Sequence, residues 1–164
     1  MHSAMQGGLA GLAATIPMTL LMNAWHRRLP FYERYPLPPR QITMRVARQA
    51  GVANRLDEPA REALTTTAHY GYGAGAGALY GLLCGRRAPV GIPNFSPGIP
   101  TGILYGLAVW SGSYLGLLPA LGILPPATRH PRRRNALMIV AHLVWGGALG
   151  GATQFLKSQT EIRR

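Results

Sequence analysis

The sequence has little charge of either sign. Charged residues make up 13% of the 164 residues, against about 25% in an average soluble domain. The charges are grouped in short blocks, which leaves uncharged runs at 3–25, 63–85, 88–128 and 135–156. Because about 20 apolar residues in a helix cross the ~30 Å hydrocarbon core of a bilayer, each run is long enough to span a membrane. The composition therefore excludes most soluble proteins and predicts a polytopic membrane protein.

Acidic residues are few, and none lies in a predicted membrane segment. The five carboxylates, Glu33, Asp57, Glu58, Glu62 and Glu161, belong to loops or to the C-terminal tail. Proton-driven carriers usually place Asp or Glu inside the membrane, so a conventional coupled transporter is disfavoured. The sequence also lacks a set of nucleophile, histidine and acid and lacks any metal-ligand spacing. We therefore expect no enzyme, no catalytic residue and no dedicated metal site.

Cysteine and lysine are nearly absent. Cys84 is the single cysteine, which excludes an internal disulfide and any multi-cysteine metal or iron–sulfur site. Apart from Lys157, every basic residue is an arginine; this usage is typical of GC-rich bacterial genomes and favours the bacterial inner membrane. The net charge of +12 comes without a nucleic-acid-binding motif, so we expect no nucleic-acid partner.

The uncharged runs predict four transmembrane helices in a single integral membrane domain, 1–164. The first run has no basic n-region and no cleavage site, which predicts a retained helix. The uncharged, proline-rich connection 88–100 is either a surface loop or a shallow re-entrant one, and the surface is favoured. A bend is expected near Pro119 in the third helix. The four helices are predicted at 3–25, 63–85, 101–124 and 135–156.

The long loop 26–62 contains two helix signals. Residues 41–50 place apolar and arginine side chains on different faces, which predicts a short interfacial helix on the membrane surface. The prolines between 30 and 39 exclude a regular helix before it. Asp-Glu-Pro at 57–59 combines a capping side chain with an acid and a proline in the first turn, which predicts a helix start that continues into the second span.

The distribution of arginines predicts the orientation. The loop 26–62 carries eight arginines and the loop before the fourth helix carries four, whereas the two loops or ends on the other side carry few. Positively charged loops remain in the cytoplasm. We therefore expect a multi-pass protein of the inner (plasma) membrane with both termini on the periplasmic or extracellular side. The basic loops are candidate contacts for anionic lipid head groups.

The second and fourth helices share the pattern Ala-His-x-x-aromatic-Gly-x-x-x-Gly. It begins at Ala68 and at Ala141, an offset of 73, and a weaker glycine match at an offset of 95 relates the first helix to the third. The matches predict a 2+2 parallel internal repeat. Glycines four residues apart let helices pack closely in a bilayer, within one chain, a homo-oligomer or a larger membrane complex. The glycines predicted to pack are Gly73, Gly77, Gly146 and Gly150.

The shared pattern places one histidine at the same depth in each of the two helices. Ionisable side chains at such depth often mark a site or a path. Two alternatives remain open. The neutral imidazoles hold the bundle together by hydrogen bonds, or they form a site, which includes axial ligation of a haem for which the nearby glycines would leave room. The predicted intramembrane polar site comprises His69, His142, Tyr72, Trp145 and Asn23, with Thr19 in the same half of the bundle.

Two short motifs resemble the YagU-like family of uncharacterised bacterial inner-membrane proteins. They are Pro-Leu-Pro-Pro-Arg at 36–40, after a glycine-rich first helix, and His-Leu-Val-Trp at 142–145. Arg34 stands where the family has an acid, two residues before the proline motif. The resemblance implies an integral membrane protein and brings no established activity. It points to Pro38, Pro39 and Arg40, with His142 and Trp145.

Arg40 has two readings. It is either one more cytoplasmic topology charge that contacts anionic lipid, or a side chain that the stiff proline segment holds over the cytoplasmic mouth of the bundle, beside Pro38 and Pro39, as an anion or substrate contact. The sequence as a whole predicts a non-enzymatic inner-membrane protein, either an envelope accessory factor or a small permeation pathway. The alternatives are a bis-His haem- or metal-binding protein, through His69 and His142, and a purely structural subunit of a larger complex.

Overall fold

Helices make up the whole architecture. The computed structural model describes residues 3–85 and 96–162, and this part of the chain contains no strand. The all-α class predicted from the sequence is confirmed. The elements are α1 (Ser3–His26), α2 (Pro38–Gln49), α3 (Glu58–Gly85), α4 (Ile99–Ser111), a π-helical segment (Gly112–Leu117), α5 (Leu118–Ala120), α6 (Arg132–Ile162) and 3-10 turns at Phe31–Glu33, Ala53–Arg55 and Ala127–Arg129.

Three helical stretches in the described residues are long and apolar enough to cross a membrane. They are Ser3–His26, Ile99–Ala120 and Arg132–Thr160. They coincide with the first, third and fourth predicted spans. The remaining long helix, α3, has 28 residues but is rich in glycine, alanine and threonine, which lowers its hydropathy. The assignment to a membrane therefore depends on α1, on α4 with its continuation through α5, and on α6.

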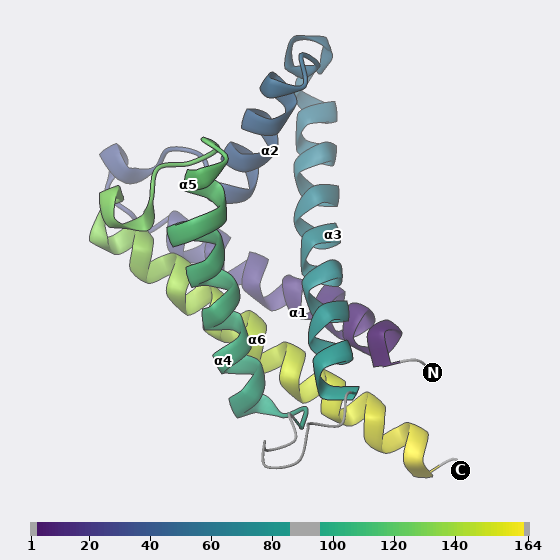
Figure 1. Ribbon diagram of the computed structural model, residues 1–164. Helices are drawn as coiled ribbons and strands as arrows, with labels where there is room; N and C mark the ends of the chain where they lie inside the picture. Colours follow the sequence, from purple (N-terminus) through teal and green to yellow (C-terminus); the bar gives the residue numbers. More distant parts are fainter. Residues whose placement is uncertain (1–2, 86–95, 163–164) are drawn as a thin grey trace.

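α1 and α3 form an antiparallel hairpin that is held by a glycine seam (Figure 1). Gly7 and Gly11 of α1 lie against Gly73, Gly77 and Gly81 of α3. A Cβ atom added to Gly77 would fall within 3.0 Å of backbone atoms in α1. The absence of side chains therefore lets the two backbones touch, which gives packing contacts where lipid provides no hydrophobic force between helices.

α4 and α6 form a second antiparallel hairpin with the same seam. Gly102 and Gly106 of α4 lie against His142, Gly146 and Gly150 of α6. In four pairs of glycines the nearest neighbouring atom is an equivalent carbonyl oxygen in the two hairpins; the pairs are Gly7 and Gly102, Gly11 and Gly106, Gly77 and Gly146, and Gly81 and Gly150. Each hairpin thus joins its two helices through the same close backbone approach.

The register of this match differs from the predicted one. The contacts equate Gly146 with Gly77, whereas the sequence alignment equates Gly146 with Gly73. Because glycines recur every four residues in both helices, alignments one helical turn apart fit the glycine pattern equally well. In the structure, His142 corresponds to Gly73 and not to His69. The prediction that the two histidines occupy equivalent depths in the repeat is therefore wrong by one turn.

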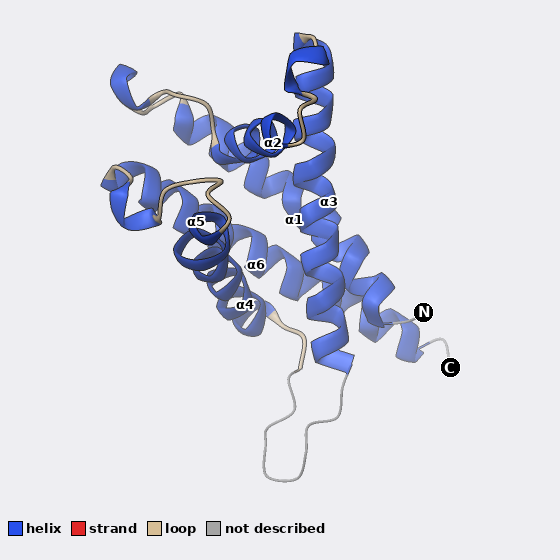
Figure 2. Ribbon diagram, turned by 45° about the horizontal axis from the view of Figure 1, so that its top comes forward, coloured by secondary structure: helices blue, strands red, loops and turns tan. Residues whose placement is uncertain are grey.

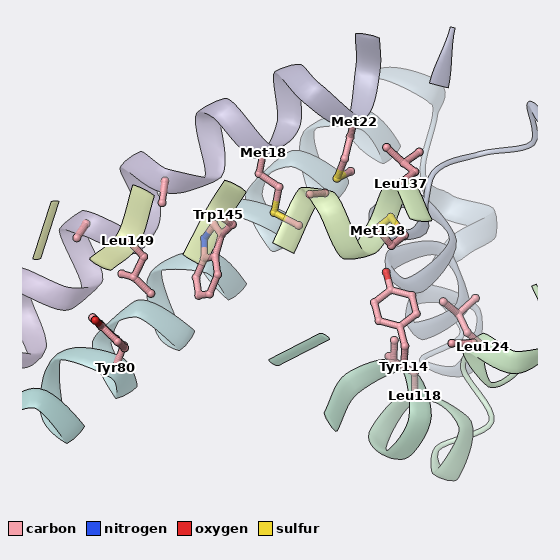
Figure 3. Packing of buried hydrophobic residues seen from close by; sticks show 14 of the residues in the cluster. Met18, Met22, Tyr80, Tyr114, Leu118, Leu124, Leu137, Met138, Trp145 and Leu149 are labelled. Carbon is pink, nitrogen blue, oxygen red and sulfur yellow. The ribbon is translucent and has the colours of Figure 1, made fainter. Parts of the chain in front are cut away.

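The two hairpins pack on each other mainly through α1 and α6, which cross in the middle of the molecule (Figure 2). In Figure 3, Met18 and Met22 of α1 point toward Met138 of α6, and Tyr114 and Leu118 approach from the side of α5. These side chains are all buried. They form the centre of the hydrophobic core.

α3 and α4, in contrast, pack little along their length. Tyrosine side chains bridge them instead. The Tyr105 hydroxyl donates to the carbonyl oxygen of Ala76 at 2.8 Å, and the Tyr80 hydroxyl lies 2.9 Å from Thr101 Oγ1. One of the two interfaces between the hairpins is therefore tight, and the other is spanned by polar side chains.

Both described ends of the chain lie at one end of the bundle (Figure 1). Gln6 Nε2 donates to Thr160 Oγ1 at 2.9 Å, which joins the start of α1 to the end of α6. At the opposite end, Arg134 donates to the carbonyl oxygens of Glu33 and Tyr35 at 2.9 and 3.0 Å. The two arginine-rich loops therefore lie together, on the side away from the termini.

α2 begins earlier than the predicted interfacial helix 41–50. Pro38 and Pro39 form its first turn, following Leu37 as the N-cap. The prediction that prolines exclude a helix here is wrong for 38–40, because residues of the first turn need no amide donor and proline fits them. The prediction for 57–59 is confirmed, since α3 begins at Glu58 and the Asp57 carboxylate accepts the amide hydrogen of Ala60 at 2.9 Å.

The third long helix ends earlier than predicted. It passes into the π-helical segment Gly112–Leu117 and stops at Ala120, not at 124, and Gly122 follows with φ of 63°. Pro119 provides no amide hydrogen, and its ring crowds the preceding turn. The distortion expected near Pro119 is therefore found in the preceding segment, Gly112–Leu117. α6 is longer than predicted 135–156 at both ends. Most of the connection 88–100 lies outside the described residues.

Candidate functional site

A cavity of about 260 Å³ lies between the two hairpins, covered by one face of α2. We call it the central cavity. Its walls come from α1, α2, α3, the segment from α4 to α5, and α6, and most of them are apolar. None of the described side chains that line it is Asp, Glu, Lys or Arg. The polar groups on its walls are Thr15, Thr43, His69, Tyr72, Ser113, Tyr114, His142 and Trp145.

Four of the five predicted intramembrane site residues line this cavity. His69 and Tyr72 come from α3, and His142 and Trp145 come from α6. Asn23 does not line the central cavity and is exposed. The buried face of α1 has a residue at every fourth position up to Met22. Asn23 follows Met22 directly and is therefore turned about 100° away from this face.

The imidazole of His142 has one nitrogen engaged. Its Nδ1 lies 2.7 Å from the carbonyl oxygen of Met138, one turn earlier in α6. Because a carbonyl only accepts, Nδ1 carries the proton of this hydrogen bond. Nε2 therefore keeps a lone pair for another partner. The ring also stands edge-on to Tyr114, with 6.1 Å between ring centroids.

The Nε2 atom of His69 is buried and lacks a hydrogen-bond partner among the described residues. A buried polar atom without a partner costs about 1–3 kcal/mol. Such atoms are few in folded proteins and commonly indicate a water, an ion or a ligand. The central cavity is therefore lined by two imidazoles that each have a ring nitrogen free to bind.

Tyr72 and Ser113 connect α3 to the π-helical segment at the side of the cavity. Their hydroxyl oxygens are 3.0 Å apart, and this hydrogen bond is exposed. Trp145 has a different role, because its Nε1 donates to the carbonyl oxygen of Gly11 at 3.3 Å. Its indole ring is a buried wall that also ties α6 to α1. The interface bridged by Tyr72 is the side on which the helices pack least.

The predicted cytoplasmic mouth is only partly present. Pro39 lines the central cavity, together with Ile42 and Thr43 of the same face of α2. Pro38 faces a small neighbouring hollow instead. Arg40 points to the other side of α2, where its guanidinium pairs with Glu58 at 2.6 Å. α2 therefore covers the cavity with uncharged side chains, and no arginine is among the described residues that line it.

The seam glycines have no free space beside them. Gly77, Gly146 and Gly150 face the backbone of a neighbouring helix. Gly73 also lies against α1, although part of it reaches the cavity wall. The room that the sequence suggested for a flat macrocycle is therefore taken up by helix packing.

Sequence reasoning missed four polar residues of the cavity walls, Thr15, Thr43, Ser113 and Tyr114. Thr15 lies on the buried face of α1, and Ser113 and Tyr114 belong to the π-helical segment. A signal was present, because Ser113 and Tyr114 are polar side chains in an otherwise apolar run between two glycines. π-helical segments often occur at functional sites, since they shift side chains out of the regular helical register.

Metal-ligand clusters of the usual kind are absent from the part of the chain that the structure describes. It contains no group of three or more His, Cys, Asp or Glu side chains arranged to hold an ion. Cys84 is buried and free, near the end of α3. Any ion in the central cavity would therefore need at least one ligand that is not His, Cys, Asp or Glu.

Comparison with known proteins brings no relative. The chain matches no protein-family model, no curated protein and no solved structure. The resemblance of 36–40 and 142–145 to the YagU-like family stays a prediction. Function has to be argued from the geometry of the site.

Proposed function

We propose that the chain is a non-enzymatic protein of the bacterial inner membrane with four spans, α1, α3, α4 with α5, and α6. The exposed apolar side chains support this proposal. On α1, Leu9, Leu12, Ile16 and Leu20 form an exposed stripe along the helix, and Leu79, Leu82, Leu83 and Leu104 extend the same character over α3 and α4. Contact of such an apolar surface with lipid tails costs no free energy, whereas its exposure to water is unfavourable.

The two hairpins are proposed to be the halves of a 2+2 repeat, with equivalent helices parallel. The matching glycine contacts support it, and so does the position of both termini at one end. The arginine-rich loops at the other end are proposed to face the cytoplasm. Glycines on the outer face of α3, such as Gly71 and Gly75, have open space beside them and remain available for a homo-oligomer or a larger complex.

Within this frame, the central cavity is a binding site on a permeation pathway for a small, uncharged solute that carries polar groups as well as carbon–hydrogen surface. The observation that carries the proposal is the cavity itself, which combines apolar walls with a few polar groups, the usual make-up of a ligand site. Its volume of about 260 Å³ suits a molecule smaller than a drug. An ion would find no opposite charge on the described walls.

Access is proposed from the side. α3 and α4 pack little on each other, and the Tyr72–Ser113 hydrogen bond is exposed where they approach the cavity. Breaking this contact would widen the opening between α3 and the π-helical segment beside the cavity, while the Tyr80 and Tyr105 bridges hold the helices together further along. α2, whose Pro39, Ile42 and Thr43 cover the cavity, forms the proposed cytoplasmic lid.

The test is permeation of neutral solutes in proteoliposomes, followed by stopped-flow light scattering. Glycerol, urea and a series of short-chain diols serve as probes of increasing size. Val109 lines the central cavity, whereas Leu104 lies on the same helix and is exposed. We expect the wild type and Leu104→Phe to accelerate solute entry over empty liposomes, and Val109→Phe to return it to the level of empty liposomes.

Correct folding of both variants is checked by size-exclusion chromatography and thermal unfolding. Equal rates for folded Val109→Phe and wild type would remove the central cavity from the pathway. Rates equal to empty liposomes for every probe with the wild type would remove permeation as the function.

A second candidate is a soft metal ion bound in the same cavity. The free nitrogens of His69 and His142 favour it, and the thioethers of Met18 and Met138 line the cavity beside them. Imidazole and thioether ligands suit Cu(I). A haem is less favoured, because the seam glycines leave no space for the macrocycle.

Absorption spectra and metal analysis of the purified protein separate these candidates. A Soret band that disappears in His69→Ala and His142→Ala would indicate haem. Copper at one equivalent, lost in the same variants and in Met18→Leu, would indicate the ion site. A protein free of both, which still conducts neutral solutes, would support permeation alone.

A further inference from the structure

A second and larger cavity, of about 500 Å³, lies on the other side of α2. We call it the arginine pocket. Arg40, Arg45 and Arg48 of α2 line it together with Arg61 of α3. At about 100° per residue, the three arginines of α2 spread over about 140° of the helix circumference, and all three line the pocket. The pocket therefore collects four guanidinium groups from two elements.

The acids near this pocket do not balance its charge. Arg40 pairs with Glu58 at 2.6 Å, and the described part of the chain shows no other ion pair. Arg61 donates from one terminal nitrogen to the carbonyl oxygen of Ala53 at 3.2 Å, while its Nε is buried without a partner. Of these four arginines, only Arg40 is ion-paired in the described residues, and no Asp or Glu is among the residues that line the pocket. The positive charge of the pocket therefore favours an anion.

We propose that the arginine pocket binds a phosphate group. The planar fork of a guanidinium matches two phosphate oxygens at once, and arginine is the preferred side chain for such bidentate contacts. Arg45 and Arg48 are exposed and supply contacts without disturbing the fold. Arg61 offers its unpartnered Nε from the wall.

The phosphate belongs either to the head group of an anionic phospholipid or to a free phosphate compound. Met44, Ile123 and Leu124 add an apolar side to the pocket, which fits the glycerol backbone and the first acyl carbons of a lipid. The lipid source rests on the proposed membrane placement, whereas phosphate recognition itself does not.

The experiment measures ligand binding to the full-length protein after removal of lipid in mild detergent. Native mass spectrometry compares phosphatidylglycerol with phosphatidylcholine, and calorimetry measures inorganic phosphate and glycerol 3-phosphate. The test variant is Arg45→Gln/Arg48→Gln. The matched control is Arg132→Gln/Arg133→Gln, which removes the same charge from two exposed arginines outside the pocket.

We expect phosphatidylglycerol to bind more tightly than phosphatidylcholine, and the pocket variant to lose affinity by roughly tenfold or more, since it removes charge-assisted hydrogen bonds to the phosphate. The control should stay within about twofold of the wild type. Tight binding of phosphatidylglycerol with weak binding of glycerol 3-phosphate identifies the lipid as the source. Equal affinities of the two identify a free phosphate compound.

Three results would overturn the proposal: equal binding of the two lipids without phosphate binding, equal losses in the pocket and control variants, or no binding of any phosphate probe. Thermal unfolding of both double variants shows whether a loss of binding arises from misfolding. If the pocket variant is unstable, Arg45→Lys/Arg48→Lys replaces it, because it keeps the charge and removes the bidentate geometry. Since the permeation test changes only Val109, failure of one proposal leaves the other standing.

Discussion

Gly77 shows how a missing side chain sets the distance between two helices. A methyl group there would press on the backbone of α1 at Gly7 and Gly11, whereas Gly75, two residues earlier, has open space around it. We expect Gly77→Ala to destabilise the protein by about 1–3 kcal/mol, as overpacking does. Gly75→Ala should be neutral or slightly stabilising, because alanine favours the helix. Thermal unfolding in detergent measures both, and equal midpoints would contradict the seam.

Arg134 fixes one loop to another from a buried position. Only 4% of it is exposed, it donates to three carbonyl oxygens between residues 33 and 36, and its guanidinium carbon lies 3.6 Å above the Tyr35 ring. We expect Arg134→Gln to lower the free energy of unfolding by about 2–3 kcal/mol. Trypsin should then cleave faster after Arg34. Exposed Arg133→Gln is the control, and the same cleavage rate in both would contradict this role.

The repeated sequence pattern predicted which side chains belong to the candidate site. His69, His142, Tyr72 and Trp145 belong to one pattern, and they line one cavity. The sequence did not distinguish Arg134 from its neighbouring arginines. An exposed arginine that sets membrane orientation and a buried arginine that holds a loop have the same sequence signature until the position of that loop is known.

The π-helical segment Gly112–Leu117 lies directly before α5, whose second residue is Pro119. Pro119 removes an amide donor from the end of the third long helix. We expect Pro119→Ala to restore regular α-helix between 112 and 120 and to protect the amides there from hydrogen exchange. Exchange followed by mass spectrometry measures this, with Pro125→Ala, outside any helix, as the control. Unchanged protection would mean that packing around Tyr114, and not the proline, sets the π geometry.

Element boundaries followed the local chemistry where that chemistry was unambiguous. The capped start of α3 could be predicted from Asp57 and Pro59. The start of α2 could not, because a proline pair such as Pro38 and Pro39 ends one helix as readily as it begins another. The register of the two seams was also not predicted. Glycines recur at every fourth position, so the two helices align equally well at offsets that differ by four residues.

For the whole molecule, the shared position of the two ends makes the orientation testable. Single cysteines at Thr128 and Ser158, both exposed, would report on opposite ends of the bundle in a Cys84→Ser background. We expect a membrane-impermeant maleimide to label Ser158→Cys in intact cells and Thr128→Cys only after permeabilisation. The reverse pattern would invert the proposed orientation, and labelling of both from one side would contradict an odd number of crossings between them.

The overall class and three spans were predictable because length and hydropathy decide them. The arrangement of the hairpins was not, because it depends on contacts between segments far apart in the sequence, such as those of α1 with α6. The central cavity is a product of that arrangement and has no signature of its own in the sequence.

The tight α1–α6 contact and the loose α3–α4 contact show that the two hairpins depart from exact twofold symmetry. Two copies of one hairpin related by a true twofold axis would have two identical interfaces, both closed or both open. Joining the copies in one chain removes that constraint, so each half accumulates its own substitutions. Here one interface is closed along its length, and the other has stayed open. In the proposed 2+2 repeat, the hollow beside the open interface is therefore a feature that an exact twofold arrangement of two hairpins could not hold on one side alone.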